Sequence, residues 1–480
     1  MRAIFRFGRN FLVSSVETDA DGYTKALSKR QVQMIAIGGA IGVGLFLGAG
    51  GRLATAGPSL ILSYAVCGLA AFFVMRALGE LVLHRPVSGS FVEYAREFIG
   101  PWAGFTSGWL YWLNWAMTGI AEITAVAIYM HKWFPDLPQW ITALVALVVL
   151  IAINMLSVKL FGELEFWFSV IKVTAIVVFL VVGTSLVIGN ADIGGTTASV
   201  SNTLGHGGLF PAGFGVALMT LQAVIFAYAA IELVGIAAGE TKDPEKIMPR
   251  AINGVVYRIA IFYVGSVLLL TMLLPWHHFT GTESPFVTVF SALGIPAVGD
   301  IMNAVVLTAA LSSCNSGLYS TGRILRSLAQ KGEAPAITGK MNSRHVPYGG
   351  ILFTGAAYLF GVVLNYIVPK EAFDIAIAVA SLGVVSTWAT LIICQLRLRK
   401  KAMAGELERP SYRMPGAPYT SYGTLAFLAL VIGQMAFGGH AEKIAFWSIP
   451  GLALVLFLGW RFVKSRQPVG PEREQLVSVD

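Results

Sequence analysis

The sequence has 480 residues, of which 56% are hydrophobic and 12% are charged, whereas soluble domains average about 25% charged residues. This composition excludes an ordinary soluble domain and indicates a protein that crosses the membrane many times. The net charge of +8 does not indicate a nucleic-acid surface, because the basic residues lie in short loops beside apolar runs.

Twelve apolar runs are long enough to form membrane-spanning helices. They lie at 32–53, 58–82, 101–130, 139–157, 164–188, 213–239, 250–274, 297–325, 349–367, 372–396, 418–437 and 443–463. We therefore predict an all-α integral membrane protein. Residues 1–31 and 464–480 are expected to be cytosolic tails, and 397–417 a basic cytosolic loop.

The charges predict how these helices are oriented. With both termini in the cytosol, the cytosolic segments hold 29 of the 34 Lys and Arg residues, and the outer segments hold four. Such an excess is typical of cytoplasmic loops.

The stretch "GGAIGVGLF" at residues 38–46 places four glycines in the first predicted span. Each glycine costs a helix about 1 kcal/mol relative to alanine. One explanation is close helix packing, because Gly38/Gly42 and Gly44/Gly48 have the small-xxx-small spacing. The other is a broken helix whose free amides bind a carboxylate and whose free carbonyls bind an ammonium group.

The sixth span contains an acidic residue, Glu232, within "FAYAAIELVGIAAGE". A charge in the middle of a span is costly, so it marks a candidate functional site. Breaks in corresponding helices of two halves indicate an inverted-repeat transporter. We predict a five-plus-five repeat with broken helices 1 and 6 in residues 32–396, followed by two extra helices in 418–463.

Several motifs resemble one known family. The stretches that carry this resemblance are "GGAIGVGLF", "AGPSLILSYAVCGLAAFFVMRALGELVLHRP", "FGELEFWFSVIKV" and "ELVGIAAGE". Through these stretches the chain resembles bacterial amino-acid permeases of the amino acid–polyamine–organocation superfamily. Within this family, the chain is most similar to permeases for L-asparagine. This similarity lies in the sequences "RQVQMIAIGGAIG", "FVEYAREFIG", "NWAMTGIAEITAVAIYMH" and "YRMPGAPYTS". The resemblance covers nearly the whole chain and implies a bacterial inner (plasma) membrane protein.

The resemblance implies a substrate site made largely of backbone. The residues expected to bind the carboxylate are Ala40, Ile41, Gly42, Val43 and Gly44. The expected partners of the ammonium group are the carbonyls of Phe226, Ala227 and Ala230. Phe226 is also the expected aromatic gate; alternatively, its side chain faces lipid or fills the protein core.

Uptake against a gradient requires a driving ion, and buried titratable groups are candidates for binding a proton. The resemblance implicates Lys172 together with Glu232 and Glu240. Lys172 lies about eight residues into its span. Instead of binding the coupling proton, its side chain could snorkel to the membrane surface or be permanently paired with an acid. Glu122 is either a second proton site or the partner of Lys172.

A pocket for asparagine must satisfy both the donor and the acceptor of the carboxamide. The candidates are Asn114 and Thr118 in the third span and Ser312, Ser313 and Asn315 in the eighth, although such side chains often bond within membrane helices instead. Glu232 is a further candidate substrate contact.

We therefore expect import of L-asparagine by proton symport with alternating access. The alternatives are another amino acid (GABA, proline, an aromatic or a small neutral one), an exchanger, or a sensor that does not transport. The chain shows no His/Cys cluster, nucleophile elbow or phosphate loop, so we predict neither an enzyme nor a cofactor or metal.

Overall fold

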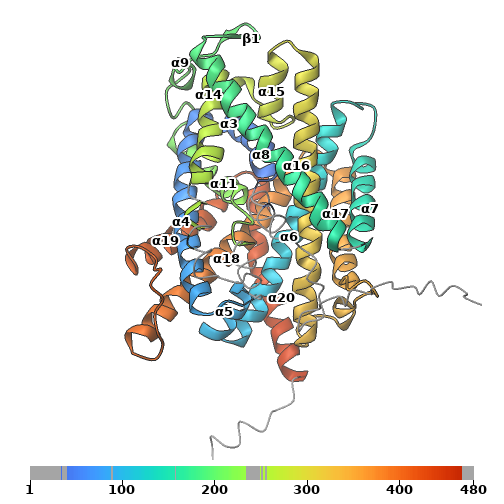
Figure 1. Ribbon diagram of the computed structural model, residues 1–480, viewed down its shortest axis with the longest axis vertical. Coiled ribbons are helices and arrows are strands. Elements are labelled where there is room, and N and C mark those ends of the chain that lie inside the picture. The colour runs from blue at the N-terminus through green and yellow to red at the C-terminus, as the bar shows by residue number, and fades with distance from the viewer. Residues whose placement is uncertain are drawn as a thin grey trace, which may run out of the picture.

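The computed structural model describes residues 41–87, 90–156, 158–233, 252–254 and 257–466, together with Met34 and Pro249. Within these residues the protein is almost entirely helical (Figure 1). The first half contains α2 Val43–Phe46, α3 Gly48–Ala56, η1 Gly57–Ser59, α4 Leu60–His84, α5 Ser90–Phe98, α6 Pro101–His131, α7 Gln139–Leu156, α8 Val158–Ile188, α9 Ser201–Leu204, α10 Phe214–Met219 and α11 Leu221–Ala227. The second half contains η2 Ile259–Gly265, α14 Ser266–Leu273, η3 Trp276–His278, α15 Pro285–Ala292, α16 Pro296–Gln330, η4 Ala336–Gly339, α17 Tyr348–Ile367, α18 Ala372–Met403, α19 Tyr419–Met435 and α20 His440–Arg466.

A short antiparallel pair of strands follows α8. Strand β1 (Asp192–Ile193) pairs with β2 (Thr196–Thr197), with Ile193 opposite Thr196. In Figure 1 this pair lies with α9 and α15 at one end of the long axis, while α5 lies toward the other end. The strand pair, α9 and α15 therefore lie at the opposite end of the bundle from α5.

Several helices are long and apolar enough to cross a membrane. Among the described residues there are seven such stretches: Val43–His84, Gln139–Leu156, Lys159–Ile188, Ala297–Gln330, Tyr348–Ile367, Ala372–Met403 and His440–Arg466. The other predicted spans coincide with less apolar or shorter helices, namely α6, α10 with α11, η2 with α14, and α19. Large apolar side chains are exposed on the outer helices, including Val148, Val181, Phe360 and Val455. Such a surface is costly in water and suits lipid, so this is an integral membrane protein.

The core surrounds α6, which packs along both α16 and α18. The buried residues of α6 recur at helical spacing, which places them on the faces that contact α16 and α18. Shorter elements lie close by, because α2 contacts α6, α11 and α16. The broken segments of the chain are therefore placed in the middle of the bundle.

Helix α8 differs from its predicted boundary. It begins at Val158 instead of 164 and has 31 residues, and in Figure 1 it runs obliquely across the face in view. The charged residues at its start, such as Lys159, did not end the helix as the sequence prediction assumed. Lys172 consequently lies near the middle of the helix, and not about two turns from its end.

Candidate functional site

The continuously described part of the first predicted span, from Ile41, opens with two residues that are not helical. Helix α2 begins at Val43, after Gly42 in an extended conformation with φ −132° and ψ −162°. The N–H groups of Leu45 and Phe46 both donate to the Gly42 carbonyl at 3.3 Å. The N–H groups of Val43 and Gly44 precede the regular helical bonds, so they can donate to acceptors outside the helix, and that of Val43 donates to Glu122. Ile41 and Val43 are buried, whereas Ala40 lies outside the described residues.

The sixth predicted span ends its helix at the same depth. Helix α11 stops at Ala227, and residues 228–232 form turns. Ala230 adopts φ +71°, a left-handed conformation that costs a residue with a Cβ atom free energy and often marks a functional site. Regular helical hydrogen bonding is therefore broken in this segment.

The two interrupted segments touch each other. A Cβ atom on Gly44 would lie 2.6 Å from the Cα atom of Ala227, far inside ordinary contact distance. Only glycine permits this approach, and the contact explains at least one glycine of the motif. Of the two alternatives that the sequence left open, close packing accounts for Gly44, and a broken first helix stays a prediction.

A small cavity lies between these segments and α6. Its lining comprises Gly42, Gly44, Asn114, Trp115, Thr118, Glu122, Phe226, Ala227, Ala229, Ala230 and Ser313. The cavity volume is about 20 Å³, which is room for one water molecule. An amino acid can enter only if the surrounding helices separate.

Most predicted substrate residues line this cavity, but Ile41, Val43 and Glu232 do not. Glu232 is nevertheless buried in the turn after α11, and its Oε2 atom has no hydrogen-bond partner among the described residues. It interacts electrostatically with Tyr111 of α6. Glu240 lies outside the described residues.

The face of α6 toward the cavity carries polar groups at helical spacing. Thr118 donates to Asn114 Oδ1 at 3.4 Å, a long and weak bond. Glu122 lies against the start of α2, because a Cβ atom on Gly42 would lie 2.9 Å from Glu122 Oε1. Its carboxylate accepts hydrogen bonds from the Ser313 hydroxyl and the Val43 N–H.

Trp115 lines the cavity and was missed by the sequence analysis. Its ring packs on Gly317 of α16, where a Cβ atom would lie 2.9 Å from Trp115 Cε3. Its Nε1 atom is buried close to the Tyr111 hydroxyl and makes no hydrogen bond of regular geometry within the described residues. The helical spacing of Trp115 to Thr118 and Glu122 could have identified it.

Lys172 belongs to a buried ionic cluster next to this site. Its Nζ atom donates to Ser312 Oγ at 2.9 Å, and Ser312 donates to Glu165 Oε1 at 2.7 Å. Lys172 Nζ lies 4.0 Å from Glu165 Oε1, and both side chains are fully buried. The sequence analysis left Glu122 as either a second proton site or the partner of Lys172, and the acid within ion-pair distance of Lys172 among the described residues is Glu165.

The ion-pair partner that the structure gives Lys172 is Glu165, which the sequence analysis overlooked. The two residues are seven apart on α8 and therefore share a face. That spacing was the signal available in the sequence.

Ion pairs tie the helices together at both ends of the bundle. Arg52 of α3 bonds Asp374 of α18 at 2.8 Å. At the opposite end, Arg96 of α5 makes two bonds to Glu333, at 2.7 and 2.8 Å. The hydrogen bonds that Arg96 donates to Glu333 raise the pKa of its guanidinium above the ordinary value. The Glu333 side chain is only 1% exposed, so this pair is strongly shielded from water.

Comparison with known proteins identifies a family. The family model described as amino acid permease matches residues 31–467. An L-asparagine permease of Streptomyces coelicolor is 54% identical over 456 residues, covering 94% of this chain and 93% of its own. The L-asparagine permease of Escherichia coli K12 is 55% identical over 448 residues, covering 93% and 90%. L-asparagine permease 2 of Mycobacterium tuberculosis is 56% identical over 450 residues, covering 93% and 92%.

Proposed function

This chain belongs to the amino acid permease family, and from that premise we propose that it imports L-asparagine by proton symport. It is a transporter and not an enzyme. The observation that carries the choice of substrate is the identity of 54 to 56% to proteins named L-asparagine permease, over more than nine tenths of the chain.

The proposed architecture has twelve spanning helices, with a five-plus-five inverted repeat and two extra helices. The meeting of the broken segments at Gly44 and Ala227 supports this arrangement, because inverted-repeat transporters bind substrate where discontinuous helices meet. The charge asymmetry of the loops supports termini in the cytosol of the bacterial plasma membrane. The end of the bundle with α5 is then cytosolic, and the end with α9 and α15 faces outward.

In this proposal the substrate carboxylate binds the backbone amides of residues 40–44, and the ammonium group meets the carbonyls of Phe226, Ala227 and Ala230. Phe226 closes over the substrate as a gate. The contact of α2 with α11 supports one site for both charges of the zwitterion, since free amides attract an anion and free carbonyls a cation.

The carboxamide of the substrate requires a donor and an acceptor. The buried Trp115 N–H is a donor that makes no hydrogen bond of regular geometry among the described residues, and the second oxygen of Glu122 is an acceptor in the same situation. Asn114, Thr118, Ser313 and Glu232 complete the set of proposed side-chain contacts. Asparagine would satisfy groups whose unpaired burial is costly.

The coupling proton is proposed to bind at Lys172, with Glu122, Glu232 and Glu240 as further titratable groups. The buried pair of Lys172 and Glu165 supports this, because a buried lysine changes its protonation state readily. Proton binding can drive the cycle only if it favours one of the inward and outward states over the other.

The test is uptake of labelled L-asparagine into proteoliposomes, with and without an imposed inward proton gradient. We expect accumulation that requires the gradient and is inhibited by unlabelled asparagine but weakly by GABA, proline or phenylalanine. Uptake that ignores the gradient and requires internal amino acid would identify an exchanger. Inhibition by a different amino acid would change the substrate, and binding without uptake would indicate a sensor.

A further inference from the structure

Two stripes of side chains face each other between α8 and α16. On α8 the stripe contains Phe161, Glu165, Ser169 and Lys172, and on α16 it contains Ser312, Asn315, Ser316 and Tyr319. Spacings of three and four residues place each set on one helical face.

Measured contacts fix both ends of this interface. Lys172 bonds Ser312 at 2.9 Å, and the rings of Phe161 and Tyr319 stack with their centroids 3.9 Å apart. The residues between these contacts therefore lie along one buried seam.

The seam contains an unusual number of polar atoms without partners. Glu165 Oε2, Ser169 Oγ, Asn315 Nδ2 and Ser316 Oγ are all buried and find no hydrogen-bond partner within the described residues. Each such group costs about 1–3 kcal/mol, so their concentration requires an explanation. A path on which water or a transferred proton binds in turn would provide one.

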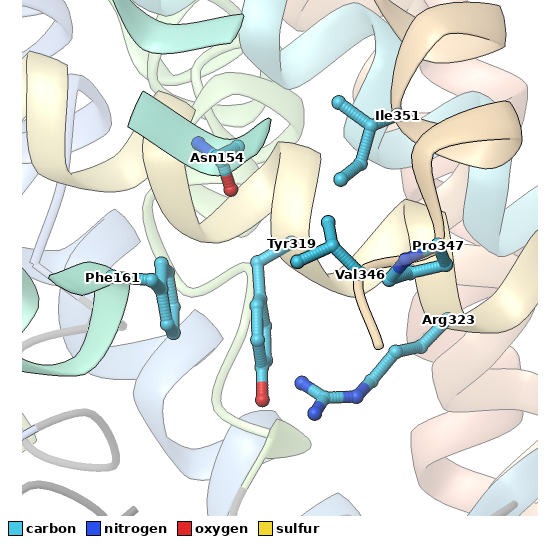
Figure 2. Close-up of a pocket in the computed structure, with 7 residues that line it drawn as sticks. All are labelled: Asn154, Phe161, Tyr319, Arg323, Val346, Pro347 and Ile351. Atoms are coloured by element: carbon cyan, nitrogen blue, oxygen red, sulfur yellow. The ribbon is translucent and has the colours of Figure 1, made fainter. Parts of the chain in front are cut away.

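The seam ends at a pocket on the proposed cytosolic side. Asn154 of α7 donates to Asn315 Oδ1 at 2.7 Å, and both Asn154 and the stacked rings line the pocket. Figure 2 shows the rings of Phe161 and Tyr319 face to face, with Asn154 beyond one end and Arg323 beside the Tyr319 hydroxyl. The Arg323 guanidinium lies 3.8 Å from the Tyr319 ring centroid. The pocket volume of about 10 Å³ is at the lower limit for one water molecule.

We propose that Glu165 accepts the coupling proton from Lys172 and releases it to the cytosol along this seam, past the Phe161–Tyr319 stack. The inference rests on the proton symport proposed above. The charged groups that interact with Lys172 are Glu165 on its own helix and Glu122 on α6. Of these two acids, Glu165 is connected to it through a hydroxyl bridge and lies on the seam.

The transfer is balanced through the bridging hydroxyl. Lys172 gives one proton to the Ser312 oxygen while Ser312 gives its own proton to Glu165. A cation and an anion thereby become a neutral amine and a neutral acid, and Ser312 is unchanged. When the stack opens, the Glu165 acid gives its proton to water that enters from the pocket. Lys172 is then protonated again from the outer side.

The first test compares proton-driven accumulation of L-asparagine with exchange against internal asparagine at equal pH. In Glu165→Gln we expect accumulation to fall to about one hundredth of the wild-type level, the lower range for loss of an acid–base group, while exchange stays within about twofold. Ser312→Ala should reduce accumulation about 10-fold, the effect of about one hydrogen bond, again with exchange retained. Glu163→Gln is the matched control, because it lies on α8 about 200° away from Glu165.

The outcomes separate the two proposals. A wild-type protein without gradient-driven accumulation refutes the symport itself. Coupled accumulation in Glu165→Gln, with a coupled wild type, refutes the role of Glu165 alone. Loss of exchange in both Glu165→Gln and Ser312→Ala would also refute it, because it would show that these residues build the substrate site. A melting temperature close to that of the wild type verifies that each variant is folded.

A second test addresses the cytosolic end of the route. On a background without the three native cysteines, Asn315→Cys is exposed to a membrane-impermeant thiol reagent from either side. We expect modification from the cytosolic side, about 10-fold faster when Tyr319→Ala removes the stack, since the ring contact contributes about 1 kcal/mol. Phe353→Ala, in another aromatic cluster on α17, is the control. Equal rates with and without Tyr319 would exclude the stack as the barrier.

Discussion

Replacement of Gly44 by alanine tests whether the two broken segments must touch. The new methyl group would lie 2.6 Å from the Cα atom and 3.0 Å from the Cβ atom of Ala227, whereas carbon atoms prefer about 3.5–4.0 Å. Because the obstacle is backbone, α2 and α11 must separate by about 1 Å. Overpacking of this kind costs about 1–3 kcal/mol.

The same separation of α2 and α11 is expected to slow transport. A misplacement of about 1 Å at a binding site can cost about 100-fold in rate. We expect the initial rate of L-asparagine uptake into proteoliposomes to fall about 10- to 100-fold in Gly44→Ala, when normalised to the amount of folded protein.

Gly48→Ala is the matched control four residues later. A Cβ atom there would meet only the Val43 carbonyl oxygen at 3.7 Å, an ordinary contact. Alanine also favours the helix by about 1 kcal/mol, so this variant should melt at a slightly higher temperature and transport normally. Gly44→Ala with wild-type rate and KM would show that the contact at Ala227 is not needed for transport.

Three further predictions concern a donor and two ion pairs. Trp115→Phe keeps an aromatic side chain but removes the five-membered ring with its N–H, so the KM for L-asparagine should rise about 10-fold while inhibition by L-alanine is unchanged. An equal change for both amino acids would contradict this. Arg52→Ala removes a pair in which Asp374 is 50% exposed, so its melting temperature should correspond to a loss of no more than about 1 kcal/mol. Glu333→Ala leaves Arg96 without its bidentate partner and should lower the free energy of unfolding by about 2–4 kcal/mol. Its melting temperature should therefore drop much more than that of Arg52→Ala, and equal drops in the two variants would refute the dependence on burial.

The positions of the helices could be predicted because hydrocarbon imposes a simple rule. Long apolar runs must satisfy their backbone hydrogen bonds internally, so runs such as 349–367 predict helices closely, and α17 spans Tyr348–Ile367. The predicted start of α8 was wrong because Lys159 is exposed, and an exposed charge is tolerated in a helix. Hydropathy indicates which residues lie within the membrane, but it does not indicate where a helix begins or ends.

The site was only partly predictable, for a different reason. Glycines and mid-span charges such as Glu122 are conspicuous in the sequence because they conflict with a membrane helix. Trp115 and Glu165 gave weaker signals, since a tryptophan agrees with an apolar span and an acid near a helix end is common. Their significance depends on which neighbours face them, and that is determined by packing between distant helices.

Helix α16 connects the proposed substrate cavity to the ionic cluster through two consecutive residues. Ser313 lines the cavity and bonds Glu122, while Ser312 bridges Lys172 and Glu165. Consecutive residues project about 100° apart, so the two hydroxyls serve different sites from one rigid turn. A shift of α16 relative to α2 and α8 would change the bonds of both hydroxyls together. A site can influence a transport cycle only if its contacts differ between the two states. In the proposed symport, this turn is therefore where proton release and substrate release can be coupled without a direct contact between the proton and the substrate.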